Sequence, residues 1–77
     1  MSVKIVVLDR LNRPLPGVTV LISWGGSTSN CKTDGGGIAD LGCSAGTAKR
    51  ILLDGDVVME GDYYLKDGIS RFNHPKK

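Results

Sequence analysis

The single histidine and the two cysteines are the residues of this sequence best suited to nucleophilic chemistry. His74 stands three residues before the end of the sequence, ahead of Pro75, and Cys31 and Cys43 are far from it in the chain. A nucleophile needs a base to activate it and a third group to orient that base. No GxSxG motif or local Cys–His pairing provides such a set, and a histidine in this position is expected at the surface. The sequence therefore predicts no catalytic residue and no enzyme.

Aspartates near predicted turns could offer oxygen ligands to calcium. They are Asp34, Asp40, Asp54, Asp56 and Asp62. An Asp-x-Asp-x-Asp-Gly spacing does not occur, and backbone geometry alone explains an Asp-Gly pair at a hairpin. Cys31, Cys43 and His74 do not follow the spacing of a zinc site, which needs four ligands. We therefore expect neither a metal site nor a cofactor.

Glycines and basic residues suggest two further kinds of site, a phosphate-binding loop and a nucleic-acid contact. The run 35–37 is all glycine, but a strand pattern follows it, whereas a phosphate-binding loop leads into a helix. The pairs Lys49-Arg50 and Arg71-Phe72 could contact nucleic acid, and Tyr63-Tyr64 lacks adjacent basic residues. Since the net charge is only +2, electrostatically driven binding to nucleic acid or membranes is not expected.

The sequence also bears on compartment and redox state. It has no basic start followed by a long apolar stretch, and its apolar runs, such as 18–22, are too short to span a bilayer. This predicts a cytoplasmic protein, unless the chain is one module of a longer exported protein. A bridge between Cys31 and Cys43 would close a loop of about a dozen residues, but two small buried thiols are the favoured interpretation.

The elements that must position these residues are strands. The 77 residues include eleven glycines, one glutamate and no glutamine, so residues that favour helix surfaces are scarce. Strand patterns alternate with turn signals at 3–9, 18–24, 31–33, 38–41, 47–53, 56–60, 63–65 and 69–73. The sequence predicts one all-β domain over residues 1–77, a small Greek-key β-sandwich of about seven antiparallel strands.

Local patterns make more detailed predictions. Alternation over 18–24 directs Val18, Val20, Ile22 and Trp24 to the core. The turns at 34–37 and at Asp54-Gly55 each predict a hairpin. Within 56–60, the alternation places Val57 and Met59 on one side and Val58 on the other. Residues 74–77 are expected to form a frayed tail.

A resemblance to a known family rests on the order of short motifs. These are Asp9 before a short loop, Pro14-Leu15-Pro16-Gly17-Val18-Thr19-Val20, and Thr33-Asp34-Gly35-Gly36-Gly37 before a strand. Over about residues 3–58 this order resembles the carboxypeptidase-regulatory-like domains of the transthyretin-like (prealbumin-like) group. Ser44-Ala45-Gly46 departs from the Pro-Gly pair that the family often has. The resemblance implies a Greek-key sandwich and carries over no functional residues, since the shared motif shapes turns.

These observations lead to one expected function and one alternative. We expect a non-catalytic accessory or protein–protein interaction module, and the resemblance suggests a place in a secretion, surface or phage-like assembly. Sheet edges pair readily with other chains, so self-association through an edge strand is one form of such contact. The alternative is a small nucleic-acid-binding β-barrel, suggested by the scattered lysines and arginines.

Overall fold

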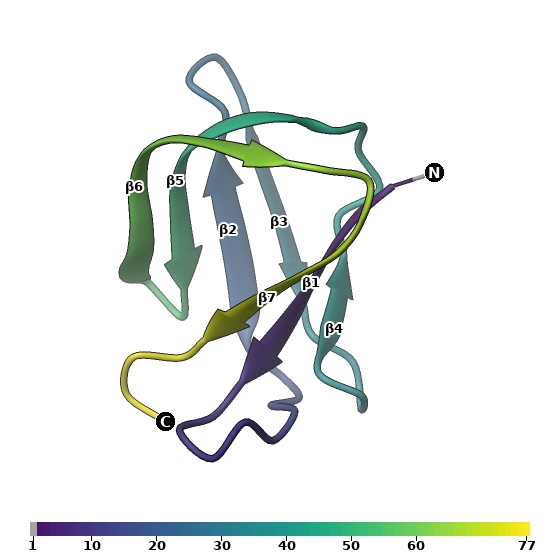
Figure 1. Ribbon diagram of the computed structural model, residues 1–77, viewed down its shortest axis with the longest axis vertical. Coiled ribbons are helices and arrows are strands. Elements are labelled where there is room, and N and C mark those ends of the chain that lie inside the picture. Colours follow the sequence, from purple (N-terminus) through teal and green to yellow (C-terminus); the bar gives the residue numbers. More distant parts are fainter. Residues whose placement is uncertain (1) are drawn as a thin grey trace.

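The part of the chain that the structure describes folds into seven strands in two facing sheets. The computed structural model describes residues 2–77, and Figure 1 shows how the strands are arranged, with the carboxy terminus at the lower left. The strands are β1 (Val3–Leu8), β2 (Thr19–Ser23), β3 (Thr28–Lys32), β4 (Ile38–Asp40), β5 (Gly46–Leu53), β6 (Asp56–Leu65) and β7 (Gly68–Asn73). Residues 2–77 contain no helix. The all-β sandwich predicted from the sequence is confirmed.

The order of the strands follows a Greek-key course. One sheet has the order β4-β1-β7 and the other β3-β2-β5-β6. The chain crosses between sheets after β1, β3, β4 and β6, and β5 returns beside β2 rather than beside β3. One pair departs from the expected antiparallel arrangement, because β1 and β7 are parallel. A parallel neighbour requires a crossover connection, and β7 reaches β1 by crossing over from the other sheet.

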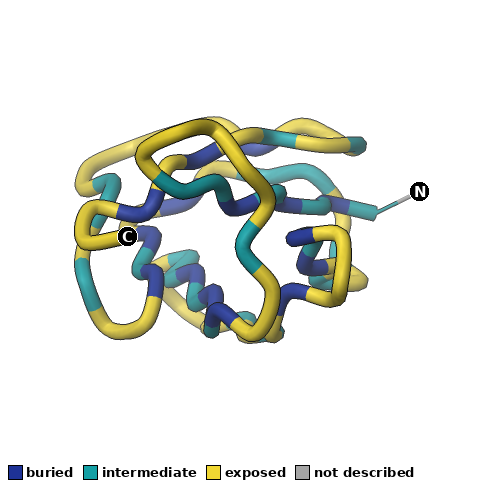
Figure 2. The backbone as a smooth tube through the Cα atoms, turned by 90° about the horizontal axis from the view of Figure 1, so that it is seen from below, coloured by how far each residue is buried: buried dark blue, intermediate teal, exposed yellow. Residues whose placement is uncertain are grey.

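The core lies between the sheets and is built from alternate residues of the facing strands. Along β1 and β2 every second residue is buried, and Figure 2 shows this alternation along the tube. The fully buried aliphatic residues with the largest side chains are Val3, Ile5, Val7, Val18, Val20, Ile22, Ile51, Leu53 and Leu65. Burial of each such side chain contributes about 1.5–3 kcal/mol. Trp24 packs against this core, as predicted.

The glycine-rich turn at 34–37 does not join a hairpin, contrary to the prediction. Oδ1 of Asp34 accepts hydrogen bonds from the Gly36 and Ile38 amides at 2.8 and 3.1 Å, so the turn itself forms where expected. Its two flanking strands then separate, since β3 pairs with β2 and β4 pairs with β1 in the other sheet. The turn is a corner between the sheets, and the amide of Val7 holds it by donating to the Gly37 carbonyl at 2.8 Å.

The hairpin predicted at Asp54-Gly55 is confirmed. Both residues have positive φ, 52° for Asp54 and 86° for Gly55, which is the signature of the two-residue turn favoured by Asp-Gly. β5 and β6 pair antiparallel on either side of it. In Figure 1 both strands bend over the upper end of the sandwich.

β6 runs from Asp56 to Leu65 and carries two interruptions in its pairing with β5. One lies where Leu52 pairs with Val57 and Ile51 with Met59, which leaves Val58 as an extra residue. The predicted alternation over 56–60 is therefore wrong. A bulge changes which side chains face inward, so Val58 and Met59 both pack on the core while Val57 is 48% exposed.

Candidate functional site

The carboxy-terminal segment is the first candidate region, and it is ordered against the sandwich. His74 is only 3% exposed, and its amide donates to the Leu8 carbonyl at 2.8 Å, which continues the ladder between β7 and β1. The Lys77 carbonyl accepts a hydrogen bond of 2.8 Å from the Arg10 amide. The structure thus contradicts both the frayed tail expected for residues 74–77 and the surface position expected for His74. The amino-acid types of the tail give no signal of these contacts, because they are backbone hydrogen bonds to distant segments.

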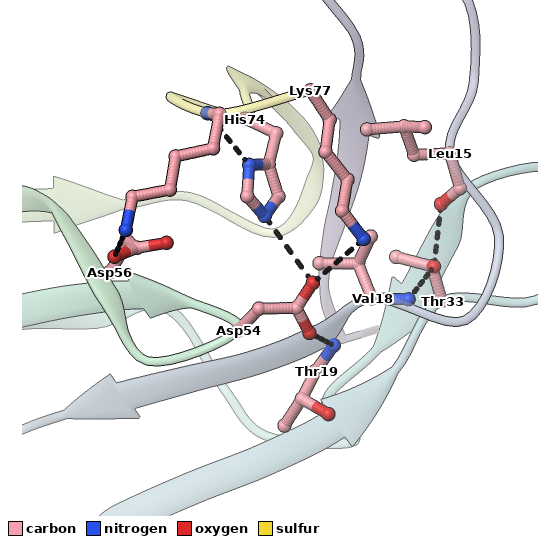
Figure 3. A network of polar contacts seen from close by, with 9 residues as sticks. Leu15, Val18, Thr19, Thr33, Asp54, Asp56, His74 and Lys77 are labelled. Carbon is pink, nitrogen blue, oxygen red and sulfur yellow. Dashed lines mark hydrogen bonds and ion pairs between the residues drawn. The ribbon is translucent and has the colours of Figure 1, made fainter.

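Both ring nitrogens of His74 have partners (Figure 3). Nδ1 lies 3.0 Å from the Lys76 amide nitrogen, and Nε2 lies 3.3 Å from Oδ2 of Asp54. Since Nδ1 accepts a hydrogen bond from the Lys76 N–H, the ring proton belongs on Nε2, where it is directed at the carboxylate. Neither nitrogen is left to take a proton from a nucleophile, as a general base must.

Asp54 connects three parts of the chain. Its Oδ1 accepts a hydrogen bond of 3.0 Å from the Thr19 amide at the start of β2, and its Oδ2 lies 3.5 Å from Nζ of Lys77. The hydrogen bond from the Thr19 amide is the main cause that holds the pKa of Asp54 below its ordinary value, with smaller contributions from His74 and Lys77, against the opposing effect of partial burial. The cluster ties the β5–β6 turn and the tail to β2.

A second polar cluster, also drawn in Figure 3, fixes the loop before β2. The hydroxyl of Thr33, which is almost fully buried, donates to the Leu15 carbonyl at 2.6 Å and accepts from the Val18 amide at 2.9 Å. These bonds satisfy backbone groups that strand pairing does not reach. The cluster therefore has a structural explanation.

The cysteines and the remaining aspartates are dispersed. Cys31 and Cys43 are free thiols, both half-buried against the core. Asp40 accepts hydrogen bonds from Ser2 and Gly42, Asp56 pairs with Lys76, and Asp62 pairs with Lys49. Within residues 2–77, no three His, Cys, Asp or Glu side chains gather in a way that could hold a metal ion.

The basic residues considered for nucleic acid have different surroundings. On β5, Lys49 and Arg50 form ion pairs of 2.6 and 2.7 Å with Asp62 and Glu60 of β6. On β7, Arg71 is exposed, and no ion pair within 4 Å involves it among residues 2–77. Arg71 is therefore an uncompensated cation at the surface.

The outer face of the three-stranded sheet carries a shallow apolar groove that our sequence interpretation missed. It has a volume of about 570 Å³. Its apolar lining is Val6, Leu8, Pro14, Ile38 and Ile69, and its polar lining is Asn12, Arg71 and Asn73. The signal in the sequence is the stretch 3–9, which after Lys4 is apolar on both faces through Leu8 and favours a strand covered on both sides. One face of β1 packs on the other sheet, and the second face forms the floor of the groove.

Comparison with protein families, with curated proteins and with solved structures gives no match. No helix that could cross a bilayer occurs in residues 2–77.

Proposed function

We propose that this chain is a non-catalytic β-sandwich module that makes protein–protein contacts, resembling the carboxypeptidase-regulatory-like domains of the transthyretin-like group. The observation that carries the proposal is an open sheet edge, β7, beside an apolar groove. Unpaired backbone groups at a sheet edge form hydrogen bonds with an added strand, and neighbouring apolar surface adds affinity.

The ionisable side chains support the same proposal. The nitrogens of His74 are engaged by Asp54 and Lys76, and Asp54 also holds Thr19. These bonds stabilise the fold, and no nucleophile lies among the atoms they join. A protein–protein interaction module requires a stable fold with an open sheet edge. The hydrogen bonds around Asp54 and His74 contribute to that stability.

The test uses the full chain as bait to capture proteins, and each capture must then be reproduced with purified proteins. A captured protein must bind again from purified components and form a complex of defined stoichiometry, measured by size-exclusion chromatography with light scattering. The control bait is Val20→Asp, which places a charge in the core and should unfold the chain. Proteins captured by both baits therefore bind unfolded chain and are discarded.

We expect at least one partner that binds the folded chain alone. Failure of every captured protein to bind again would contradict the proposal. Salt-dependent binding of single-stranded DNA or RNA without a protein partner would also contradict it and would favour the nucleic-acid alternative.

A further inference from the structure

The backbone of β7 has one paired edge and one open edge. The Gly68 amide donates to the Ser2 carbonyl at 3.0 Å, and the His74 amide donates to the Leu8 carbonyl at 2.8 Å. Because the direction of backbone groups alternates along a strand, the intervening even-numbered residues also face β1. The N–H and C=O groups of Ile69 and Arg71 therefore point away from β1, toward the side on which no strand of residues 2–77 pairs with β7.

The side chains of these two residues lie beside the open edge on the outer face of the sheet. Ile69 and Arg71 both line the apolar groove, and Ile69 is 49% exposed. On the inner side of β7, the ring of Tyr63 meets the ring of Phe72 edge-on, with centroids 5.9 Å apart, and Tyr63 remains 36% exposed. A strand added to this edge would find apolar surface on both of its faces.

The charges on this face favour a partner that brings a carboxylate. Lys4 stands directly across from Asp40 in the pairing of β1 with β4, so a carboxylate already lies next to it. Arg71 pairs in register with Val6 and has no ion-pair partner among the described residues. An acidic residue on an added strand would supply the missing opposite charge.

A second copy of this chain fits the same edge poorly. When two β7 strands pair antiparallel, residues whose backbone groups point to the open edge must lie opposite one another. Two registers meet this condition and pair most of the strand. One register places Arg71 opposite Arg71 of the second copy. The other places Arg71 opposite Ile69 and leaves the two arginines diagonal on one face. β7 has no acidic residue to offset this repulsion.

The other edges are less suited to an added strand. β4 has only three residues, and β6 is interrupted by register shifts. The most exposed side chains of β3 are polar, namely Thr28, Asn30 and Lys32. Short, irregular or polar edges resist strand addition.

We infer that the open edge of β7 docks an extended segment of a partner protein, with an acidic side chain beside Arg71 and apolar side chains beside Ile69 and Tyr63. This inference rests on the proposed function and specifies its partner chemistry. The segment adds as a strand next to β7, and the sheet order becomes β4-β1-β7-segment. Backbone hydrogen bonds to Ile69 and Arg71 hold it, and the carboxylate sets its register.

The test selects random peptides of about eight residues, which is within the usual range of strand lengths, on the immobilised full chain. We expect the bound peptides to carry Asp or Glu among alternating apolar residues. Affinity should fall about tenfold in Arg71→Glu, which turns an attraction into a repulsion. The matched control is Lys66→Glu, which makes the same charge change in the neighbouring turn and should leave affinity unchanged.

A second variant tests the backbone contact separately from charge. Chemical ligation at Gly42-Cys43 allows synthesis of the chain with an N-methyl group on the amide of Arg71. This amide faces the open edge, so methylation removes a docking donor, while the ladder to β1 and the guanidinium remain. We expect peptide binding to be lost and the amide spectrum of the unbound chain to be retained.

Several results would overturn the inference. They are selected peptides without acidic residues, equal binding to wild type and Arg71→Glu, an equal loss in Lys66→Glu, an empty selection, or a dimer joined through β7. If a reconstituted protein partner binds and ignores both Arg71 variants, this inference fails while the proposed function stands. If no protein partner binds at all, the proposed function fails first.

Discussion

Nε2 of His74 lies 3.3 Å from Oδ2 of Asp54, so a residue of the carboxy-terminal segment contacts the turn between β5 and β6. The same carboxylate accepts a hydrogen bond from the Thr19 amide at the start of β2. This pair therefore couples the tail to the four-stranded sheet, while the His74 amide couples it to β1 of the other sheet.

Replacing His74 with alanine should destabilise the fold by about 2 kcal/mol, because it removes a buried ring together with its hydrogen bonds. Urea unfolding followed by circular dichroism measures the change. Lys76→Ala is the matched control, since it removes only an exposed ion pair with Asp56 and should cost at most about 1 kcal/mol. Equal losses in the two variants would show that the contact between His74 and Asp54 does not stabilise the tail.

Stability should decrease as the pH falls below about 4, and Asp54 should contribute to the decrease. The pKa of Asp54 is lowered from 3.8 in the folded chain, chiefly by the Thr19 amide. A depressed folded pKa adds stability above the unfolded pKa, and this stability is lost as the pH falls through the folded pKa.

Urea midpoints measured from pH 6 down to about pH 2 test this dependence on Asp54. The slope below about pH 4 should be shallower in Asp54→Asn than in the wild type. Asp62→Asn, which removes an exposed carboxylate of β6, serves as the control. A slope unchanged by Asp54→Asn would contradict the assignment.

Gly37→Ala should destabilise the corner between β3 and β4 by about 2 kcal/mol. Gly37 has a φ of 76°, and an added Cβ would lie 2.8 Å from Cβ of Pro14. Gly35→Ala in the same turn is the control, because nothing lies within 4 Å of its added Cβ. Thermal or urea unfolding of the two variants compares them, and equal stability would argue against the close approach of the loop at Pro14.

The bulge in β6 should make two neighbouring valines differ in how much they stabilise the fold. Val58→Ala should cost about 1–2 kcal/mol, because Val58 packs on the core. Val57→Ala should cost less than about 0.5 kcal/mol, because Val57 is exposed. Urea unfolding measures both changes, and an equal or larger loss for Val57→Ala would contradict the inward position of Val58.

The correct sequence predictions rest on short-range signals. Asp54-Gly55 specifies its turn through two adjacent backbone angles, and the alternation from Val18 to Ile22 specifies a buried face through neighbouring residues. The all-β class and most strand positions follow from such local preferences. Such features can be predicted from the sequence because each depends on a few consecutive residues. Two strand positions do not follow from them, because β3 begins at Thr28, ahead of the pattern at 31–33, and β6 joins the patterns at 56–60 and 63–65 into one strand.

The missed features depend on partners far away in the chain. The short strand β4 pairs with β1 because the turn at 34–37 is a corner between the sheets. The residues of the turn do not distinguish a corner from a hairpin. Val58 becomes an inward residue through a bulge, which shifts the pairing by one position. His74 is buried by contacts with Leu8 and Asp54, and the groove at Ile69 requires the parallel pairing of β7 with β1.

That parallel pairing also has a mechanical consequence. β1 and β7 run in the same direction side by side, so the start of β1 and the end of β7 lie at opposite ends of their ladder (Figure 1). A tensile force applied at the two ends pulls β1 and β7 past each other along their length. The ladder from Gly68–Ser2 to His74–Leu8 then bears the load in shear, all bonds together, instead of opening one bond at a time.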